Sequence, residues 1–209
     1  MNYFTKSRVE AFSDGVFAII VTLLVLEIKV PHIESANSIH ELSEALLHLA
    51  PKFIAWVISF VVVGVIWVNH HRIFESLKHI DHNLFWLNAN LLLWASFIPF
   101  PTALLGDYPH NALAVSFFGI ANFLMGMAFL FLRIYMWKKP ELTNGFTKEY
   151  LWQGVRNVLL FGPFLYLIAA ITAWIHPFIA FSIYAFIPIY FIFPQATALQ
   201  KPEDLQQKL

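Results

Sequence analysis

Six long apolar stretches constrain the fold of this chain more than any other feature. They cover about residues 9–30, 51–75, 83–105, 111–136, 151–173 and 177–195. A helix needs ~20 mainly apolar residues to cross the hydrocarbon layer of a bilayer, and stretches of this length are typical of such spans. We therefore predict an all-α, polytopic membrane protein with six transmembrane helices.

The composition supports this class and excludes others. Hydrophobic residues make up 59% of the chain and charged residues only 12%, whereas about half of an ordinary soluble domain is apolar. Thirteen basic residues balance thirteen acidic ones, so nothing indicates a nucleic-acid partner. Cysteine is absent, which excludes disulfides and thiol catalysis. No nucleophile–base pair, phosphate-binding loop or metal-ligand set is seen, so we expect no enzyme, cofactor or metal.

The basic residues predict the orientation. An even number of spans places both termini on one side, together with the links between spans two and three and between spans four and five. Lys29 and Lys52 fall on the other side, and all remaining basic residues fall on the first: Lys6, Arg8, Arg72, Lys78, Arg133, Lys138, Lys139, Lys148, Arg156, Lys201 and Lys208. Basic residues concentrate in cytoplasmic loops. We therefore predict a multi-pass protein of the cell inner (plasma) membrane with both termini in the cytoplasm.

The links between the spans carry their own signals. Between the first two spans, Ile39, Leu42, Leu46 and Leu47 have near-helical spacing and predict a short surface helix. The prolines and the glycine between residues 100 and 111 predict a tight loop. A hairpin is expected at residues 175–177, and Pro188 predicts a kink in the sixth span.

The first span is unusual because it carries charge. Only twelve residues separate Asp14 from Glu27, and charge at this depth is costly unless it meets protein or water. At about 100° per residue, Ser13 and Asp14 point away from a stripe made of Arg8, Phe12, Gly15, Ile19, Thr22, Leu23, Leu26 and Val30. We interpret the helix as buried in an assembly or lining a wet path. Alternatively, its aliphatic residues are ordinary core or lipid-facing positions.

The charged end of this span resembles a known signature. The run Arg8-x-x-x-Phe12-Ser13-Asp14, followed by Gly-Val-Phe-Ala-Ile-Ile-Val-Thr-Leu-Leu-Val-Leu-Glu, is similar to that of the prokaryotic relatives of the lysosomal potassium channel, the transmembrane protein 175 family. The pair of histidines after a tryptophan in the second span fits the same family. The resemblance implies a homotetramer in which four first helices surround a central cation pore. Residues 1–195 would then form one six-helix transmembrane channel domain and residues 196–209 a cytoplasmic tail.

The resemblance also implies where the pore narrows. It places aliphatic rings at Ile19, Leu23 and Leu26 and a hydroxyl layer at Thr22, and all four lie on the stripe described above. The sequence lacks the Thr-Val-Gly-Tyr-Gly motif of carbonyl filters, and hydrophobic constrictions gate by dewetting. We therefore expect a leak-type channel permeable to the potassium ion, with modest selectivity over sodium. Its expected partners are monovalent cations, copies of itself and the lipid bilayer.

The remaining polar residues receive structural roles. Trp67, His70 and His71 lie on the second span at the depth of Ser13 and Asp14, and either histidine is predicted to bond Asp14. Arg8 is a second candidate to neutralise Asp14, in its own or an adjacent chain. Interhelical hydrogen bonds are expected from further polar residues in the spans: Asn88, Asn90, Ser96, Asn122, Thr172 and Ser182.

Glu27 has two open interpretations. At the outer mouth it would concentrate cations, or it pairs with Lys29 or Lys52. Two other functions also remain. A proton-coupled secondary transporter would use Asp14 with His70 or His71, and would be expected to show inverted repeats. A non-conducting membrane scaffold would leave the charges of the first span without a purpose.

Overall fold

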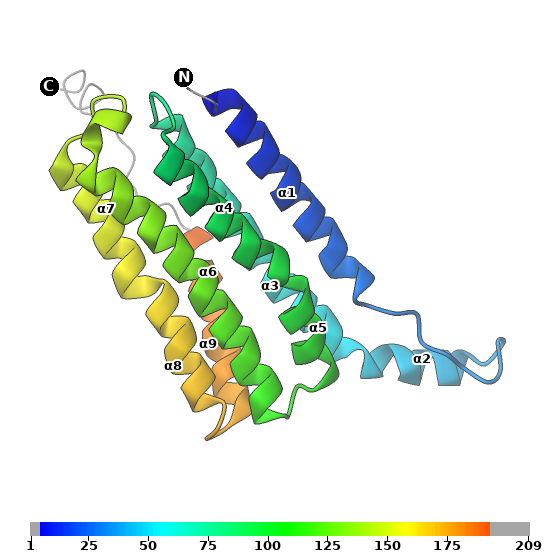
Figure 1. Ribbon diagram of the computed structural model, residues 1–209. Coiled ribbons are helices and arrows are strands. Elements are labelled where there is room, and N and C mark those ends of the chain that lie inside the picture. The colour runs from blue at the N-terminus through cyan, green and yellow to red at the C-terminus, as the bar shows by residue number, and fades with distance from the viewer. Residues whose placement is uncertain (1–4, 193–209) are drawn as a thin grey trace, which may run out of the picture.

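The computed structural model describes residues 5–192, and in this part the chain is a bundle of long helices with a short helix projecting from one end (Figure 1). Five helical segments are long and apolar enough to cross a membrane. They are α1 (Lys6–Leu26), α3 (Ala50–Glu75), α4 with α5 (His82–Phe97 and Pro99–Asp107), α6 (Ala112–Lys138), and α7 with α8 (Lys148–Phe161 and Pro163–Thr172). The prediction of an all-α polytopic membrane protein is confirmed.

The sixth apolar segment is shorter. Helix α9 (Pro177–Ile192) follows the hairpin expected at residues 175–177, and Pro188 lies inside it. Its 16 residues rise ~24 Å at 1.5 Å each, somewhat less than the ~30 Å hydrocarbon layer. The last residues of the predicted span and the tail 196–209 lie outside the described residues, so the sixth span stays a prediction.

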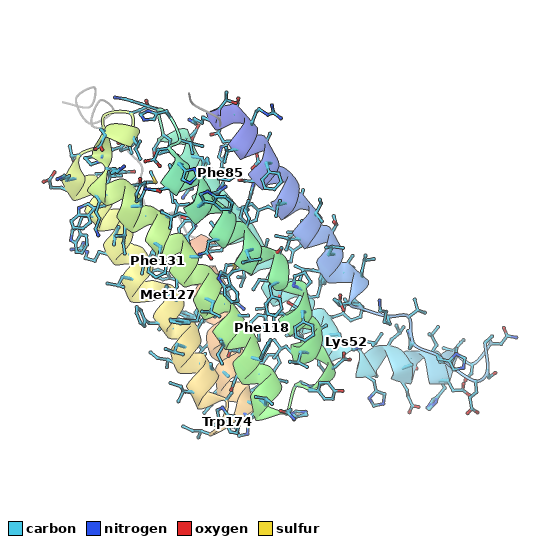
Figure 2. All side chains as sticks on the ribbon, in the orientation of Figure 1. Lys52, Phe85, Phe118, Met127, Phe131 and Trp174 are labelled. Atoms are coloured by element: carbon cyan, nitrogen blue, oxygen red, sulfur yellow. The ribbon has the colours of Figure 1, made fainter. Side chains whose placement is uncertain are left out.

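The tight loop expected between residues 100 and 111 is wrong over most of its length, because α5 occupies Pro99–Asp107. Pro99 begins the helix at a position whose N–H needs no partner, which a proline tolerates. Gly106 serves a close approach and not a turn, since a Cβ there would lie 3.0 Å from the Cα of Lys52. Lys52, which Figure 2 labels at the start of α3, also forms an ion pair of 2.5 Å with Asp107.

The first helix ends earlier than its apolar pattern suggested. Helix α1 stops at Leu26, and Val30 is 91% exposed in the link that follows. Pro31 disfavours helical backbone at the residue before it, so Val30 does not belong to the helical stripe. The surface helix predicted around residue 40 is confirmed as α2 (Ile39–His48), which runs across the long axis of the bundle (Figure 1).

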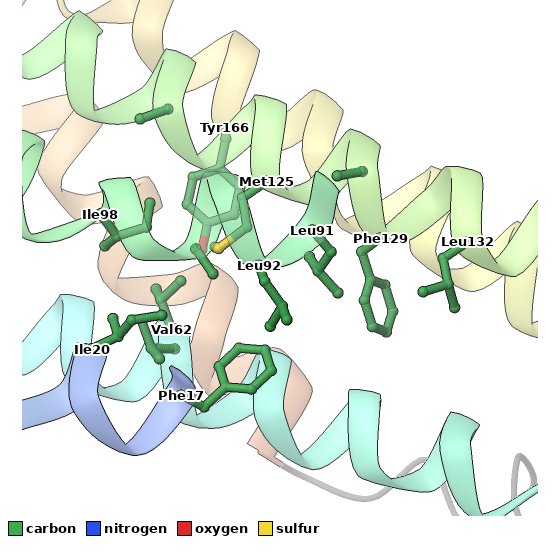
Figure 3. Packing of buried hydrophobic residues seen from close by; sticks show 14 of the residues in the cluster. Phe17, Ile20, Val62, Leu91, Leu92, Ile98, Met125, Phe129, Leu132 and Tyr166 are labelled. Atoms are coloured by element: carbon green, nitrogen blue, oxygen red, sulfur yellow. The ribbon is translucent and has the colours of Figure 1, made fainter. Parts of the chain in front are cut away.

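Helix α6 is the centre of the packing. It contacts α4, α5, α7, α8 and α9, while α1 packs on α3 and α4. Figure 3 shows Phe17 and Ile20 of α1 facing Val62 and Leu92, with Met125 and Tyr166 on the other side of the same core. The close packing around α6 depends on a missing side chain at Gly119, where a Cβ would lie 2.2 Å from the Tyr184 hydroxyl. That hydroxyl donates to the carbonyl oxygen of Val115 at 3.0 Å.

We predict that Gly119→Ala destabilises the protein by about 2 kcal/mol, because the added methyl group displaces Tyr184 and overpacks the core. Thermal unfolding of the purified protein in detergent measures the effect. Gly64→Ala is the matched control, since a Cβ at Gly64 meets nothing within 4 Å. Equal unfolding temperatures for the two variants would contradict the packing described for α6.

Asp81 fastens the link between α3 and α4 to the end of α6. Its carboxylate accepts the backbone N–H of Leu84 at 2.8 Å, the Tyr135 hydroxyl at 2.5 Å and the Lys139 ammonium at 3.2 Å. Desolvation alone would raise the pKa of the Asp81 carboxyl, but the bonds from Tyr135, Leu84 and Lys139 outweigh it and lower this pKa below its ordinary value. Asp81 is therefore both the N-cap of α4 and an anchor for α6.

We expect Asp81→Asn to unfold at a lower temperature than the unchanged protein at pH 7, since the amide keeps the cap but loses the charge that Lys139 and Tyr135 contact. A carboxyl whose pKa is lowered by folding stabilises the protein above its unfolded pKa of ~3.9 and loses that effect as the pH falls through its folded pKa. The difference in unfolding temperature between the two proteins should therefore shrink as the pH falls below about 4. A difference independent of pH would show that the charge contributes nothing.

Candidate functional site

Helix α1 has one face inside its own chain and one face outside. The buried residues are Val9, Ser13, Phe17, Ile20 and Leu24. The other face carries the aliphatic and aromatic residues of the predicted stripe, which are exposed by 60% at Phe12, 59% at Ile19, 41% at Leu23 and 59% at Leu26. The spacing of three and four residues keeps them on one side of the helix. Within one copy of the described chain, this stripe has no cover.

The polar residue on the stripe is oriented by its own helix. The Thr22 hydroxyl lies 2.8 Å from the carbonyl oxygen of Ile19 and 3.2 Å from that of Ala18, and donates its proton to this pair. Its oxygen therefore keeps lone pairs that are free to accept or to coordinate. Arg8 is exposed at the start of the same face, and a Cβ at Gly15 would meet nothing within 4 Å.

A buried polar network fastens the opposite face of α1. The Ser13 hydroxyl donates to the Val9 carbonyl oxygen at 2.8 Å and accepts from Asn88 Nδ2 at 2.9 Å. Asn88 Oδ1 in turn lies 2.8 Å from His70 Nε2, which donates to it. The ring of His70 stacks on Phe74 at 4.1 Å between centroids. Three helices, α1, α3 and α4, thus meet at side chains that are all buried.

Asp14 is held by a different residue from the ones predicted. Trp67 Nε1 donates to Asp14 Oδ1 at 2.9 Å, while His70 is engaged by Asn88 and His71 stacks on Trp67 at 6.1 Å between ring centroids. Adjacent helical residues diverge by about 100°, so His70 faces the core and His71 lies beside the tryptophan. No ion pair joins Arg8 to Asp14 in the part of the chain that the structure describes.

Most of the other span residues predicted to bond between helices instead donate within their own helix. Asn88 makes the interhelical bonds predicted for it, but Ser96, Asn122, Thr172 and Ser182 donate to carbonyl oxygens of their own helices. A side chain of this kind reaches a carbonyl one turn back, so its presence in a span does not require a partner helix. For Asn90 the described residues show no side-chain hydrogen bond.

Glu27 caps the carboxyl end of α1 and is half-buried. Neither predicted partner reaches it, because Lys29 donates to the Leu26 carbonyl oxygen at 2.8 Å and Lys52 pairs with Asp107. Among the described residues, no group of three or more His, Cys, Asp or Glu side chains is placed to hold a metal ion.

A groove runs between α1 and α3 beside the exposed stripe. Its volume is about 770 Å³, and it is lined mainly by apolar side chains, with a polar end formed by Asp14, Trp67, Asn69 and Arg72. The tryptophan–aspartate bond described above therefore lies in this groove and not in the core. The flank of α1 that faces this groove is therefore uncovered within one chain, as the stripe is.

The buried network yields a stability prediction with a matched control. Asn88→Leu leaves His70 Nε2 without a partner and removes the bond that the Ser13 hydroxyl accepts, so we expect a loss of about 2–4 kcal/mol. Asn122→Leu makes the same change at an equally buried site, where Oδ1 has no partner among the described residues, so it should be neutral or stabilising. Unfolding in detergent compares the two, and an equal loss in both would contradict the anchoring role of Asn88.

Comparison with known proteins identifies the family of the chain. The family described as the endosomal/lysosomal potassium channel TMEM175 matches residues 8–99. A potassium channel of Chamaesiphon minutus is 38% identical over 191 residues, which cover 88% of this chain and 92% of the relative. A potassium channel of Chryseobacterium sp. is 32% identical over 190 residues, with 91% and 94% covered.

A solved structure is also similar. The crystal structure of a lysosomal potassium-selective channel TMEM175 homologue from Chamaesiphon minutus matches with a TM-score of 0.79 and 36% identity, over 90% of this chain and 96% of that one. Identity above 30% over nearly the whole of both chains establishes the relationship. The chain belongs to the TMEM175 family, a family of ion channels and not of enzymes.

Proposed function

We propose that the chain forms a homotetrameric, leak-type channel permeable to potassium, with its constriction on the exposed stripe of α1. The relatives of similar length are named potassium channels. The observation that carries the proposal is the stripe itself, because Ile19, Leu23 and Leu26 leave the chain's own core while the other face of α1 is fastened to α3 and α4.

A lipid-facing position explains this stripe less well. Lipid chains would cover aliphatic residues at no cost, but the stripe also presents Arg8 and Thr22, and the flank of α1 beside it presents Asp14. Asp14 lies eight residues into the helix, ~12 Å from its start, where an ionised carboxylate facing lipid is costly. A water path lined by the stripe, with a neighbouring copy in the groove between α1 and α3, suits both the apolar and the polar residues.

The stripe would act as a dry collar. Ile19 and Leu26 are seven residues apart, so the rings of a tetramer would form a constriction ~10 Å long. Such a collar gates by dewetting, and a small widening restores the water column. Potassium sheds hydration water more readily than sodium, so forced partial dehydration favours potassium. Thr22, whose proton is held by the backbone, would offer four oxygens to replace part of the lost shell.

The positions relative to the membrane follow from the charge distribution. The protein would span the inner membrane with both termini in the cytoplasm. Glu27 would then stand at the outer mouth of the pore and attract cations. Residues 1–195 would constitute the channel domain and residues 196–209 a cytoplasmic tail. Phe12, Ser13 and Asp14, with Trp67, His70 and His71, would hold the pore helix in place rather than contact the ion.

We expect Ile19→Asn to widen and wet the narrowest ring. In liposomes containing the purified protein, potassium flux should rise several-fold and sodium flux should rise more, so that the selectivity between the two ions falls. Val25→Asn is the control, since Val25 is exposed on the same helix but lies ~120° from the stripe. It should leave both fluxes within about twofold.

Three outcomes would overturn the proposal. Unchanged sodium and potassium fluxes in Ile19→Asn would remove the constriction from this ring. Potassium flux strictly coupled to protons would favour a transporter that uses Asp14. Absence of flux from correctly folded protein would favour a scaffold. In a separate measurement, light scattering of the same sample would test whether the protein is a tetramer.

A further inference from the structure

A second cluster of polar residues lies between α6 and α7 and extends to Arg72 of α3, which also lines the groove beside α1. Arg133 of α6 lies with its guanidinium carbon 5.3 Å from the centroid of the Phe129 ring. The guanidinium occupies the space that a side chain at Gly154 of α7 would need, since a Cβ there would lie 2.2 Å from an Arg133 nitrogen. Glycine at this position thus makes room for the arginine between two helices.

Among the described residues, no anion is paired with this arginine. Its Nε is buried and has no hydrogen-bond partner, and the ion pairs among the described residues involve neither Arg133 nor Arg72. Arg72 of α3 is close enough for its charge to act on Arg133, and both charges act on Tyr150 of α7. Within the part of the chain that the structure describes, two permanent cations therefore share a site with no carboxylate paired to either, which is costly for partly buried charges.

The depth of the cluster matches the edge of a bilayer. Helix α6 has 27 residues and a length of ~40 Å, close to the full thickness of a bilayer with its headgroups. Arg133 lies five residues before the end of α6, ~8 Å inside. One turn further out, Trp137 packs on the exposed Trp152 with 4.9 Å between ring centroids, as tryptophans do at the membrane interface.

We propose that Arg133 and Arg72, with the space left by Gly154, form a binding site for the phosphate of an anionic phospholipid headgroup. A guanidinium donates two parallel hydrogen bonds to phosphate oxygens, which would give the charge of Arg133 a partner. Basic pockets between spans are places where membranes supply such headgroups. The lipid chains would lie along the exposed apolar surface of α7, beside Trp152.

The site is tested by lipid binding to the purified full-length protein. Native mass spectrometry during titration with phosphatidylglycerol or phosphatidylcholine gives both affinities. We expect phosphatidylglycerol to bind about twentyfold more tightly, and Arg133→Gln to weaken it about fivefold, the effect of one basic residue at a lipid surface. Phosphatidylcholine binding should not change. Arg156→Gln, which removes an exposed arginine ~200° around α7 from Gly154, should bind phosphatidylglycerol within about twofold of the unchanged protein.

Two further variants make the result decisive if Arg133→Gln does not fold. Arg72→Gln removes the second charge, and Gly154→Ala pushes the guanidinium out of its space, so each should also weaken phosphatidylglycerol binding. The proposal is overturned if these variants bind phosphatidylglycerol as the unchanged protein does, or if Arg156→Gln weakens it equally. Displacement of the lipid by millimolar inorganic phosphate would assign the site to a soluble anion instead. None of these measurements depends on ion conduction.

Discussion

The rest of the structure depends on the buried hydrogen bonds from Ser13 through Asn88 to His70. Each of these groups lies in the core of a membrane bundle, where an unpaired polar group is costly. Each has its partner on another helix, so α1, α3 and α4 are fixed relative to one another in depth and in rotation. Because the rotation of α1 is fixed, the side that carries Ile19 and Leu26 must point away from the chain's own core.

In the proposed channel, anchoring and permeation would use opposite faces of one helix. The anchoring face consists of residues whose bonds are complete within a single chain. The stripe and the neighbouring groove are the parts that a single chain leaves open, and they hold the features that the proposed pore needs: aliphatic rings and a hydroxyl whose proton is already engaged. Asp14, bonded to Trp67 at the edge of the groove, joins the two regions. We propose that its charge serves to position the helix.

Around α6, two glycines have opposite effects on the polar groups that pack against them. Around α6, small residues such as Gly119 and Gly154 let neighbouring groups approach closely. At Gly119 the approaching group is the Tyr184 hydroxyl, which finds a carbonyl oxygen and completes the core. At Gly154 it is the Arg133 guanidinium, which finds no acceptor within the described chain. The space at Gly119 is filled by a hydroxyl whose hydrogen bond is complete, whereas the space at Gly154 holds a cation that suits a lipid phosphate.

The sequence by itself determined the elements that depend on length and period. Apolar stretches of about 20 residues predicted five of the spans within a few residues, because a helix is one of the few structures that can cross a bilayer. The spacing of leucines predicted α2. The sequence also predicted which residues of α1 share a face. Local signals were misleading where a residue type is compatible with either a loop or a helix. The prolines and the glycine were interpreted as a loop, but Pro99 begins α5 and Gly106 lets it pack closely against Lys52.

Only the tertiary structure decided the partners. A tryptophan rather than a histidine bonds Asp14. Of the span residues predicted to bond between helices, Asn88 does so. In the described part of the chain, Arg133 has no ion-pair partner. These outcomes depend on which helices are neighbours and at what depth. A polar side chain in a span has a carbonyl oxygen of its own helix within reach, so its identity does not reveal its partner until the helices are placed.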